Sequence, residues 1–227
     1  MKLTYWSHSC FLIETRSHRL VVDPFLSGNP LAPVKATEVR CDFVLITHGH
    51  NDHVGDAVEI AKRCGATIVA NYEVAMFCQS QGATVHPMHI GGSWTFPFGR
   101  VKLTIAHHGS AYQTADGFVN GGQPAGVLIM TEGKTVYHAG DTALFMDMQV
   151  IGQRHRPTVA LLPIGDNFTM GIEDAVQAVE WLRPDVAVPM HYNTFDLIRA
   201  DPQEFARQVR AKGYRAEVLA PGGTLTV

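Results

Sequence analysis

The most informative stretch of this 227-residue chain is Phe43-Val44-Leu45-Ile46-Thr47-His48-Gly49-His50-Asn51-Asp52-His53. Its apolar first residues predict a buried strand, and four side chains that can bind a metal follow within six positions. His48 and His50 are two residues apart, so in an extended chain they point to the same side. Asp52 and His53 follow where a helix is predicted to begin. One short loop therefore offers ligands to two adjacent cations.

The chemistry of this loop favours a metal site. Three imidazoles and a carboxylate buried together without a cation would leave unpaired polar groups, which are costly in a protein interior. Imidazole and carboxylate ligands without thiolate suit zinc and its first-row neighbours. The four cysteines are widely spaced and form no C-x-x-C pair, so a zinc ribbon is not expected.

Three other predicted strands each deliver a candidate ligand where they end. Val101–Ala106 leads to His107 and His108, Thr135–His138 leads to Asp141, and Val186–Pro189 leads to His191. A metal centre at the edge of a sheet requires such a pattern, with several strands contributing one side chain each.

Short β-branched runs alternate with helical patterns along the chain. Strands are predicted at Phe11–Glu14, Arg19–Val22, Phe43–Thr47, Thr67–Ala70, Val101–Ala106, Gly126–Thr131, Thr135–His138, Val159–Pro163 and Val186–Pro189. Helices are predicted at Asp56–Cys64, Glu73–Gln81 and Ile172–Leu182, with another opening at Asp201-Pro202. This alternation predicts an α/β fold, and the length and lack of linkers predict a single domain over residues 1–227.

Composition narrows the class of protein. The 18 Lys and Arg against 21 Asp and Glu give a net charge of −3, which argues against a nucleic-acid partner. No apolar run approaches the ~18 residues of a membrane span, and the first residues lack the apolar stretch of a signal peptide. We therefore expect a cytoplasmic protein that acts on a small-molecule substrate without a membrane partner. The sequence leaves open whether it forms a homo-oligomer.

The motif H-x-H-x-D-H after a strand resembles the signature of the metallo-β-lactamase superfamily. More narrowly, the chain resembles a group of small metal-dependent hydrolases akin to L-ascorbate-6-phosphate lactonase. The matching segments are His8-Ser9-Cys10-Phe11, Asp23-Pro24-Phe25, Tyr137-His138-Ala139-Gly140-Asp141-Thr142, Leu162-Pro163-Ile164-Gly165, Phe168-Thr169-Met170-Gly171 and Pro189-Met190-His191-Tyr192-Asn193. This resemblance covers nearly the whole chain and implies a four-layer αββα sandwich with the metals at one edge, between two sheets.

The resemblance also implies a ligand set. His48, His50 and His108 match the ligands of a first metal; Asp52, His53 and His191 match those of a second; Asp141 matches the bridging carboxylate. The chain departs from the family at His107, where related sequences commonly carry an aromatic residue. Two adjacent histidines cannot both face one cation without distortion, so we favour His108 as the ligand and His107 as part of the pocket wall.

Such a centre would hydrolyse an ester, lactone, amide or phosphoester bond by means of a metal-bound hydroxide. A cation lowers the pKa of bound water from 15.7 toward about 7, and a second cation can hold the electrophile. Two divalent ions are expected, with zinc as the first choice and manganese or iron as alternatives. Asp52 and Asp141 are the expected catalytic residues, with Asp52 binding metal and orienting the nucleophile.

Further residues are candidates for contact with substrate, although each also has a structural explanation. They are His8, His107, His138, Thr169, Tyr192 and Asn193. Asp23 is expected to brace the metal loops and not to bind metal itself.

Two other functions remain open from the sequence. The same scaffold can hold iron in a redox protein, because the ligand types alone do not exclude that metal. A phosphodiesterase or nuclease is the other alternative, although the net charge argues against it. A purely structural metal site is the least favoured, because the predicted site has room for water.

Overall fold

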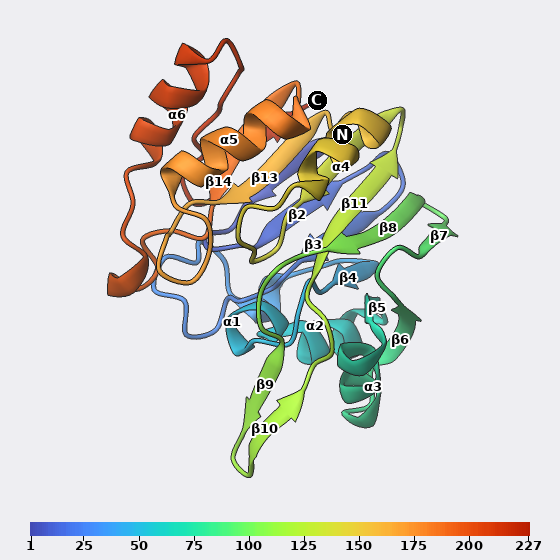
Figure 1. Cartoon of the computed structure of the whole chain (residues 1–227). Helices are drawn as coiled ribbons and strands as arrows, with labels where there is room; N and C mark the ends of the chain where they lie inside the picture. Colours follow the sequence, from blue (N-terminus) through green and yellow to red (C-terminus); the bar gives the residue numbers. More distant parts are fainter.

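Two β-sheets pack face to face in the computed structural model, which describes all 227 residues (Figure 1). The first sheet has seven strands in the order β15-β1-β2-β3-β4-β5-β6. The bounds of these strands are β1 (Lys2–Tyr5), β2 (Phe11–Glu14), β3 (Arg19–Val22), β4 (Phe43–Leu45), β5 (Thr67–Asn71), β6 (Thr84–Met88) and β15 (Thr224–Thr226).

The second sheet has six strands in the order β14-β13-β12-β11-β8-β7. Their bounds are β7 (Ser93–Phe96), β8 (Gly99–Ile105), β11 (Ala125–Thr131), β12 (Lys134–His138), β13 (Val159–Pro163) and β14 (Val186–Met190). A separate hairpin of β9 (Ala111–Thr114) and β10 (Gly117–Asn120) projects from the body of the molecule (Figure 1).

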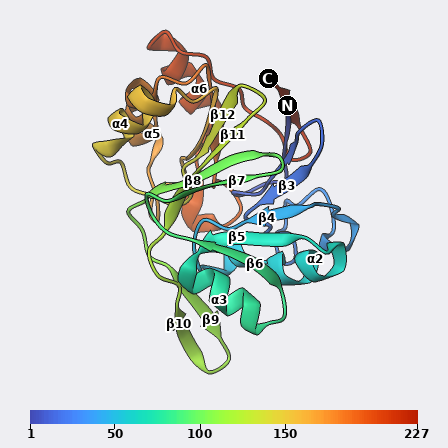
Figure 2. The same cartoon turned by 90° about the vertical axis from the view of Figure 1, so that its right-hand side faces the viewer.

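Helices cover the outer faces of both sheets, which completes four layers (Figure 2). The helices are α1 (Asn51–Val54), α2 (Ala57–Cys64), α3 (Tyr72–Ser80), α4 (Asp147–His155), α5 (Ile172–Leu182) and α6 (Pro202–Ala211), with 3-10 turns at Ala36–Glu38 and Asp196–Ile198. One apolar cluster lies between the sheets, one lies under α2 and α3, and one lies under α4, α5 and α6. The αββα sandwich expected from the sequence is confirmed. None of the six helices combines the length and the apolar character needed to cross a bilayer.

Strand direction brings distant parts of the sequence to one edge of the sandwich. In the second sheet, β8 and β12 both run antiparallel to β11, and β12, β13 and β14 run parallel to one another. The carboxyl ends of β8, β12 and β14 therefore meet at the same edge. The Ala125 amide donates to the Thr47 carbonyl at 2.9 Å, which places the end of β4 in the first sheet beside this edge.

Every predicted strand and helix is present, with boundaries within about two residues, but several elements were not predicted. The clearest of these is α4, whose middle contains Gly152, a poor helix former. A Cβ at this glycine would lie 2.4 Å from the Trp181 carbonyl of α5. Close packing of the two helices requires the glycine, and that requirement is invisible in a single helix.

Candidate metal centre

Seven candidate ligands from four separate segments lie together at this edge. The loop after β4 and helix α1 supply four of them, and the loops after β8, β12 and β14 supply one each. Together with His8, these seven residues fall into three groups, and within each group the nitrogen and oxygen atoms that could bind a metal lie within 4.8 Å of one another. The groups are His8, Asp52, His53 and His191; His48, His50 and His108; and His48, His53 and Asp141.

The Asp141 carboxylate lies at the centre of the cluster. Its Oδ2 is 3.0 Å from His191 Nε2, 3.3 Å from His53 Nε2 and 3.5 Å from His108 Nε2. This one oxygen therefore faces histidines that come from three separate segments. Gly140 permits the preceding turn, because its φ is +64° and an added Cβ would lie 2.7 Å from the Ala125 carbonyl.

Three imidazoles form one side of the cluster. His48 Nε2 and His50 Nδ1 are 3.0 Å apart, and the His108 ring centroid is 5.1 Å from His48 and 5.0 Å from His50. The structure therefore brings together the three histidines that the sequence analysis expects to bind a first metal, and their role as ligands stays a prediction.

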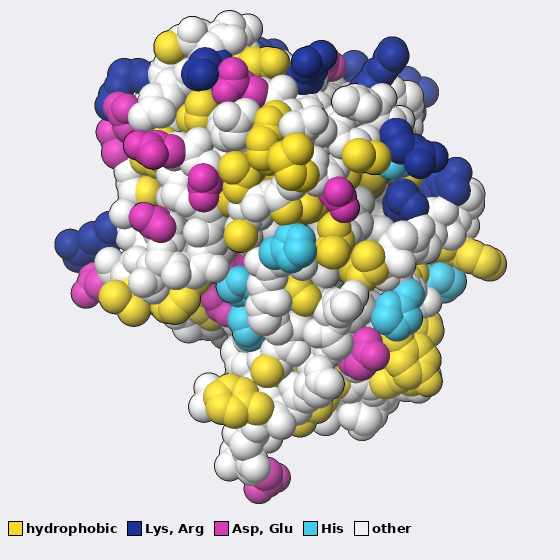
Figure 3. Space-filling model, viewed as in Figure 1, with side chains coloured by type: hydrophobic (Ala, Val, Ile, Leu, Met, Phe, Trp, Pro, Cys, Tyr) yellow, Lys and Arg dark blue, Asp and Glu magenta, His cyan; other side chains and the backbone are white.

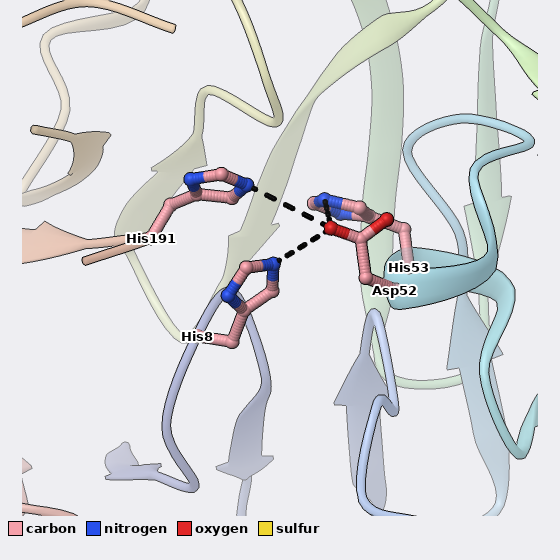
Figure 4. Close-up of side chains that lie close together, drawn as sticks. All are labelled: His8, Asp52, His53 and His191. Carbon is pink, nitrogen blue, oxygen red and sulfur yellow. Dashed lines mark hydrogen bonds and ion pairs between the residues drawn. The ribbon is translucent and has the colours of Figure 1, made fainter. Parts of the chain in front are cut away.

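Asp52 lies on the other side of the cluster, where three imidazoles surround its carboxylate. Figure 4 shows His8, His53 and His191 turned toward its carboxylate. Asp52 Oδ2 is 3.1 Å from His8 Nε2, 3.9 Å from His53 Nε2 and 4.0 Å from His191 Nε2. His8 Nδ1 also lies 3.0 Å from the Thr194 hydroxyl, so both of its nitrogens are engaged.

Hydrogen bonds behind the cluster orient two of its imidazoles. Asp23 accepts from His53 Nδ1 at 2.8 Å and from the Thr47 hydroxyl at 2.7 Å, and it also accepts the Thr47 amide. The Thr47 hydroxyl lies 3.0 Å from His48 Nδ1. Since Nδ1 of each imidazole is held from behind, Nε2 of each is directed into the cluster, as in carboxylate–histidine–metal arrangements.

Backbone strain accompanies the site. His8, Asp23 and His191 have φ values of +56°, +45° and +55°, a left-handed conformation that residues other than glycine rarely adopt. The His191 amide donates to the His8 carbonyl at 2.8 Å, which ties two of these strained residues together. Strain of this kind is concentrated at functional sites.

Several buried polar atoms of the cluster lack a hydrogen-bond partner. They are His53 Nε2, Asp141 Oδ1, and both ring nitrogens of His191. His191 Nε2 is close to Asp141 Oδ2, but the pair lacks hydrogen-bond alignment. Unpaired buried groups are costly, and bound cations would satisfy Nε2 of both histidines and the carboxylate. The residues present therefore fit a metal centre.

The pKa values reflect burial and the crowding of charge. Burial lowers the pKa of three imidazoles: His48, His50 and His108. Burial also opposes the charged form of His53, but nearby carboxylates, Asp141 first among them, raise its pKa well above the ordinary value. Burial opposes the charge of Asp141 as well, yet His191 and His53 hold its pKa well below the ordinary value. These shifts favour the ionised form of Asp141 and the neutral form of His48, His50 and His108, which are the forms that bind metal.

A pocket of about 220 Å³ opens over the cluster. We call it the metal pocket; it is lined by His50, Asp52, His108, Asp141, Phe168, His191 and Phe195. The remaining candidate ligands, His48 and His53, are fully buried beneath it.

The other residues singled out in the sequence lie outside the metal pocket. His107 is exposed and packs on Phe145, with ring centroids 5.2 Å apart. His138 is fully buried, and its Nε2 lies 2.9 Å from the Ser9 carbonyl. Neither residue lines the metal pocket, so the structure offers no support for the expectation that they contact a substrate there.

The same holds for three residues in the late loops. The Thr169 hydroxyl donates to the adjacent Met170 carbonyl at 3.3 Å. Tyr192 is buried beside Tyr5, with ring centroids 6.4 Å apart. Asn193 accepts the Ala200 amide at 3.0 Å and thereby shapes its own loop.

Sequence reasoning missed the two aromatic residues of the metal pocket. Phe168 and Phe195 are 51% and 40% exposed. Each stands among polar turn residues, in Asp166-Asn167-Phe168-Thr169 and Asn193-Thr194-Phe195-Asp196. A large apolar residue within such a turn is the signal that would have identified them, because turns lie on the surface.

Known proteins resemble this chain over most of its length. A family model described as the beta-lactamase superfamily domain matches residues 18–192. A UPF0173 metal-dependent hydrolase of Anoxybacillus flavithermus is 53% identical over 214 residues, covering 94% of this chain and 95% of that protein. A UPF0173 metal-dependent hydrolase of Bacillus cereus is 51% identical over 229 residues and covers 100% of both chains.

A solved structure of another metallo hydrolase has a similar fold. The chain matches Igni18, a metallo hydrolase from the archaeon Ignicoccus hospitalis, with a TM-score of 0.91 and 42% identity. The match covers 100% of this chain and 97% of that chain. The resemblance to the superfamily is confirmed, whereas the narrower kinship with the lactonase stays a prediction. The chain belongs to the metallo-β-lactamase superfamily and is one of its metal-dependent hydrolases.

Proposed function

We propose that the chain holds two divalent cations and uses them to hydrolyse an ester, lactone, amide or phosphoester bond of a small substrate. In this proposal His48, His50 and His108 hold one cation, and Asp52, His53 and His191 hold the other. Asp141 is shared between them. The observation that carries the proposal is the position of Asp141 Oδ2, within 3.5 Å of Nε2 of His53, His108 and His191.

Divalent cations at such a site lower the pKa of coordinated water, so that hydroxide is available near neutral pH. The protein fixes where that chemistry takes place. Asp141 sets the spacing of the two sites, and Asp52, with its side chain 29% exposed to the pocket, can accept a hydrogen bond from the nucleophile. His8 holds the Asp52 carboxylate from the side opposite to solvent.

Metal content tests the ligand assignment. Purified wild-type protein reconstituted with zinc should contain two equivalents per chain when measured by mass spectrometry. His108→Ala should lose about one equivalent, whereas the matched variant of the adjacent residue, His107→Ala, should keep both. One equivalent in the wild type, or equal losses in the two variants, would contradict the proposal.

Activity tests the reaction class. Zinc- and manganese-loaded protein should hydrolyse at least one carbonyl ester, lactone or phosphodiester, and His48→Ala should abolish that activity. Stoichiometric iron in protein that hydrolyses none of these would favour the redox alternative instead.

A further inference from the structure

We propose that the substrate presents an uncharged, apolar group, such as a short alkyl chain or a phenyl ring, to Phe168 and Phe195 at the rim of the metal pocket. The inference rests on the proposed function and names the substrate class for that site.

Few side chains in the lining of the metal pocket are available to recognise the substrate. Its ionisable residues are all candidate metal ligands, namely His50, Asp52, His108, Asp141 and His191. Once these bind cations, only Phe168 and Phe195 remain to contact the part of the substrate that does not react. Such contacts are apolar, and a pocket of about 220 Å³ admits only a small group.

The backbone holds Phe168 at the rim at the cost of strain. The preceding residues, Asp166 and Asn167, have φ values of +57° and +45°, which Asp and Asn tolerate better than most residues. The amide of the buried Met170 donates to the Thr142 carbonyl at 2.9 Å, which ties this turn to the residue after Asp141. The strained turn thus fixes the backbone of Phe168 at the pocket that Asp141 also lines, and observed strain of this kind supports a functional role.

Phe195 is fixed from the opposite loop. Its ring centroid is 5.5 Å from that of His8 and 6.1 Å from that of Phe25. The Thr194 hydroxyl meets His8 Nδ1 at 3.0 Å, and the amide of the buried Ile198 donates to the Phe195 carbonyl at 3.2 Å. The ring of Phe195 and the backbone that carries Phe168 are therefore positioned before a substrate arrives, which reduces the entropic cost of binding.

Charge argues against a substrate that carries a phosphate group away from the reacting bond. Proteins bind phosphate groups with Arg and Lys side chains, and the lining of the metal pocket contains neither. Figure 3 shows the Lys and Arg side chains in groups apart from the histidines at the centre of this face. A phosphate monoester remote from the reacting bond would find no cationic side chain in the pocket.

A pair of matched esters tests the substrate class. The substrates are p-nitrophenyl pentanoate and mono-p-nitrophenyl glutarate, which share the ester bond and the leaving group and differ in the terminal carboxylate. For the zinc-loaded protein we expect kcat/KM to be at least roughly tenfold higher for the pentanoate. Equal or faster hydrolysis of the glutarate would overturn the inference. Failure of the wild type to hydrolyse either ester would count against the proposed function instead.

The contribution of Phe168 and Phe195 can also be tested by measuring the binding of a ligand instead of hydrolysis. Saturation-transfer NMR should detect benzamide, an uncharged aromatic probe, on both metal-free and zinc-loaded wild type. Phe168→Ala and Phe195→Ala should each weaken binding by roughly fivefold or more and leave zinc content unchanged. The matched control is Leu197→Ala, which removes a 66% exposed apolar side chain beside Phe195 and outside the pocket. Equal benzamide binding in all four proteins would refute the inference.

Discussion

The metal pocket differs from a larger groove elsewhere on the molecule in its size, in its charge and in whether its polar groups have hydrogen-bond partners. The groove lies between α4 and the outer face of β8 and has a volume of about 690 Å³, against about 220 Å³ for the metal pocket. Arg100, Lys102 and Arg154 line it, so we call it the basic groove. Lys102 donates to the Gly91 carbonyl, and Arg100 donates to the Ser93 hydroxyl at 2.6 Å.

Four of the seven buried side-chain atoms without a hydrogen-bond partner belong to the cluster at the metal pocket, and none belongs to a residue that lines the basic groove, although the groove is larger. The polar groups named in the basic groove find partners or solvent, whereas His53, Asp141 and His191 are buried with atoms that lack a partner. A cluster of this kind is stable only if something else supplies the missing interactions. The following predictions test the contrast, beginning with the largest effect.

Removing the Asp141 carboxylate, which lies at the centre of the cluster, should cause the largest loss of activity. Asp141→Ala should lower kcat/KM by more than roughly a thousandfold, since even the loss of a hydrogen-bonded partner of a ligand typically costs 10–100-fold. Steady-state kinetics together with metal content would check this. Asp147→Ala is the matched control, because Asp147 is the carboxylate of the basic groove and is exposed. If Asp141→Ala and Asp147→Ala lost similar amounts of metal, the metal pocket would not differ from the basic groove in metal binding, and the prediction would be wrong.

Weakening the brace behind the pocket should have an intermediate effect. Asp23→Asn keeps the size of the side chain but weakens the acceptor of the His53 Nδ1 hydrogen bond. Zinc affinity should fall roughly 10–100-fold, as is usual for partners of metal ligands. Competition with a chromophoric chelator would measure the change. Unaltered affinity in a folded variant would show that the brace does not contribute to metal binding.

Metal removal should lower the thermal stability. A ligand present at 100 times its Kd stabilises the native state by about 2.7 kcal/mol, and for a chain of this size that corresponds to roughly 5–10 °C in Tm. Differential scanning calorimetry with zinc and then with chelator would measure the shift. The variant Arg100→Gln/Lys102→Gln/Arg154→Gln should show the same shift, because its changes lie in the basic groove. A different Tm shift in this variant would show that the basic groove contributes to metal binding, against the prediction.

The smallest effect is expected from the basic groove itself. In the absence of metal, that triple variant should change the free energy of unfolding by no more than about 0.5 kcal/mol per substitution, as is usual for exposed residues. Its kcat/KM for p-nitrophenyl pentanoate should stay within about twofold of the wild-type value. A loss of tenfold or more would show that the groove contributes to turnover.

The candidate ligands could be predicted because their spacing is local or lies at strand ends. The loop from His48 to His53 carries its pattern in consecutive residues, and Asp141 and His191 follow strands with clear β-branched patterns. The neighbours of these ligands were harder to predict. Tyr192 follows His191 directly, yet it points into the core, because successive side chains at a strand exit face different ways.

Sequence alone determined the candidate ligands, the strand and helix periodicities and the family to which the chain belongs. Tertiary structure decided that His48, Asp141 and His191 meet, and that Phe168 and Phe195 stand over them in place of Thr169 and Asn193. The reason is physical. Periodicity in a sequence records which side of an element is buried, but strand order and direction determine which loops share an edge, and loop geometry determines which side chain faces the pocket.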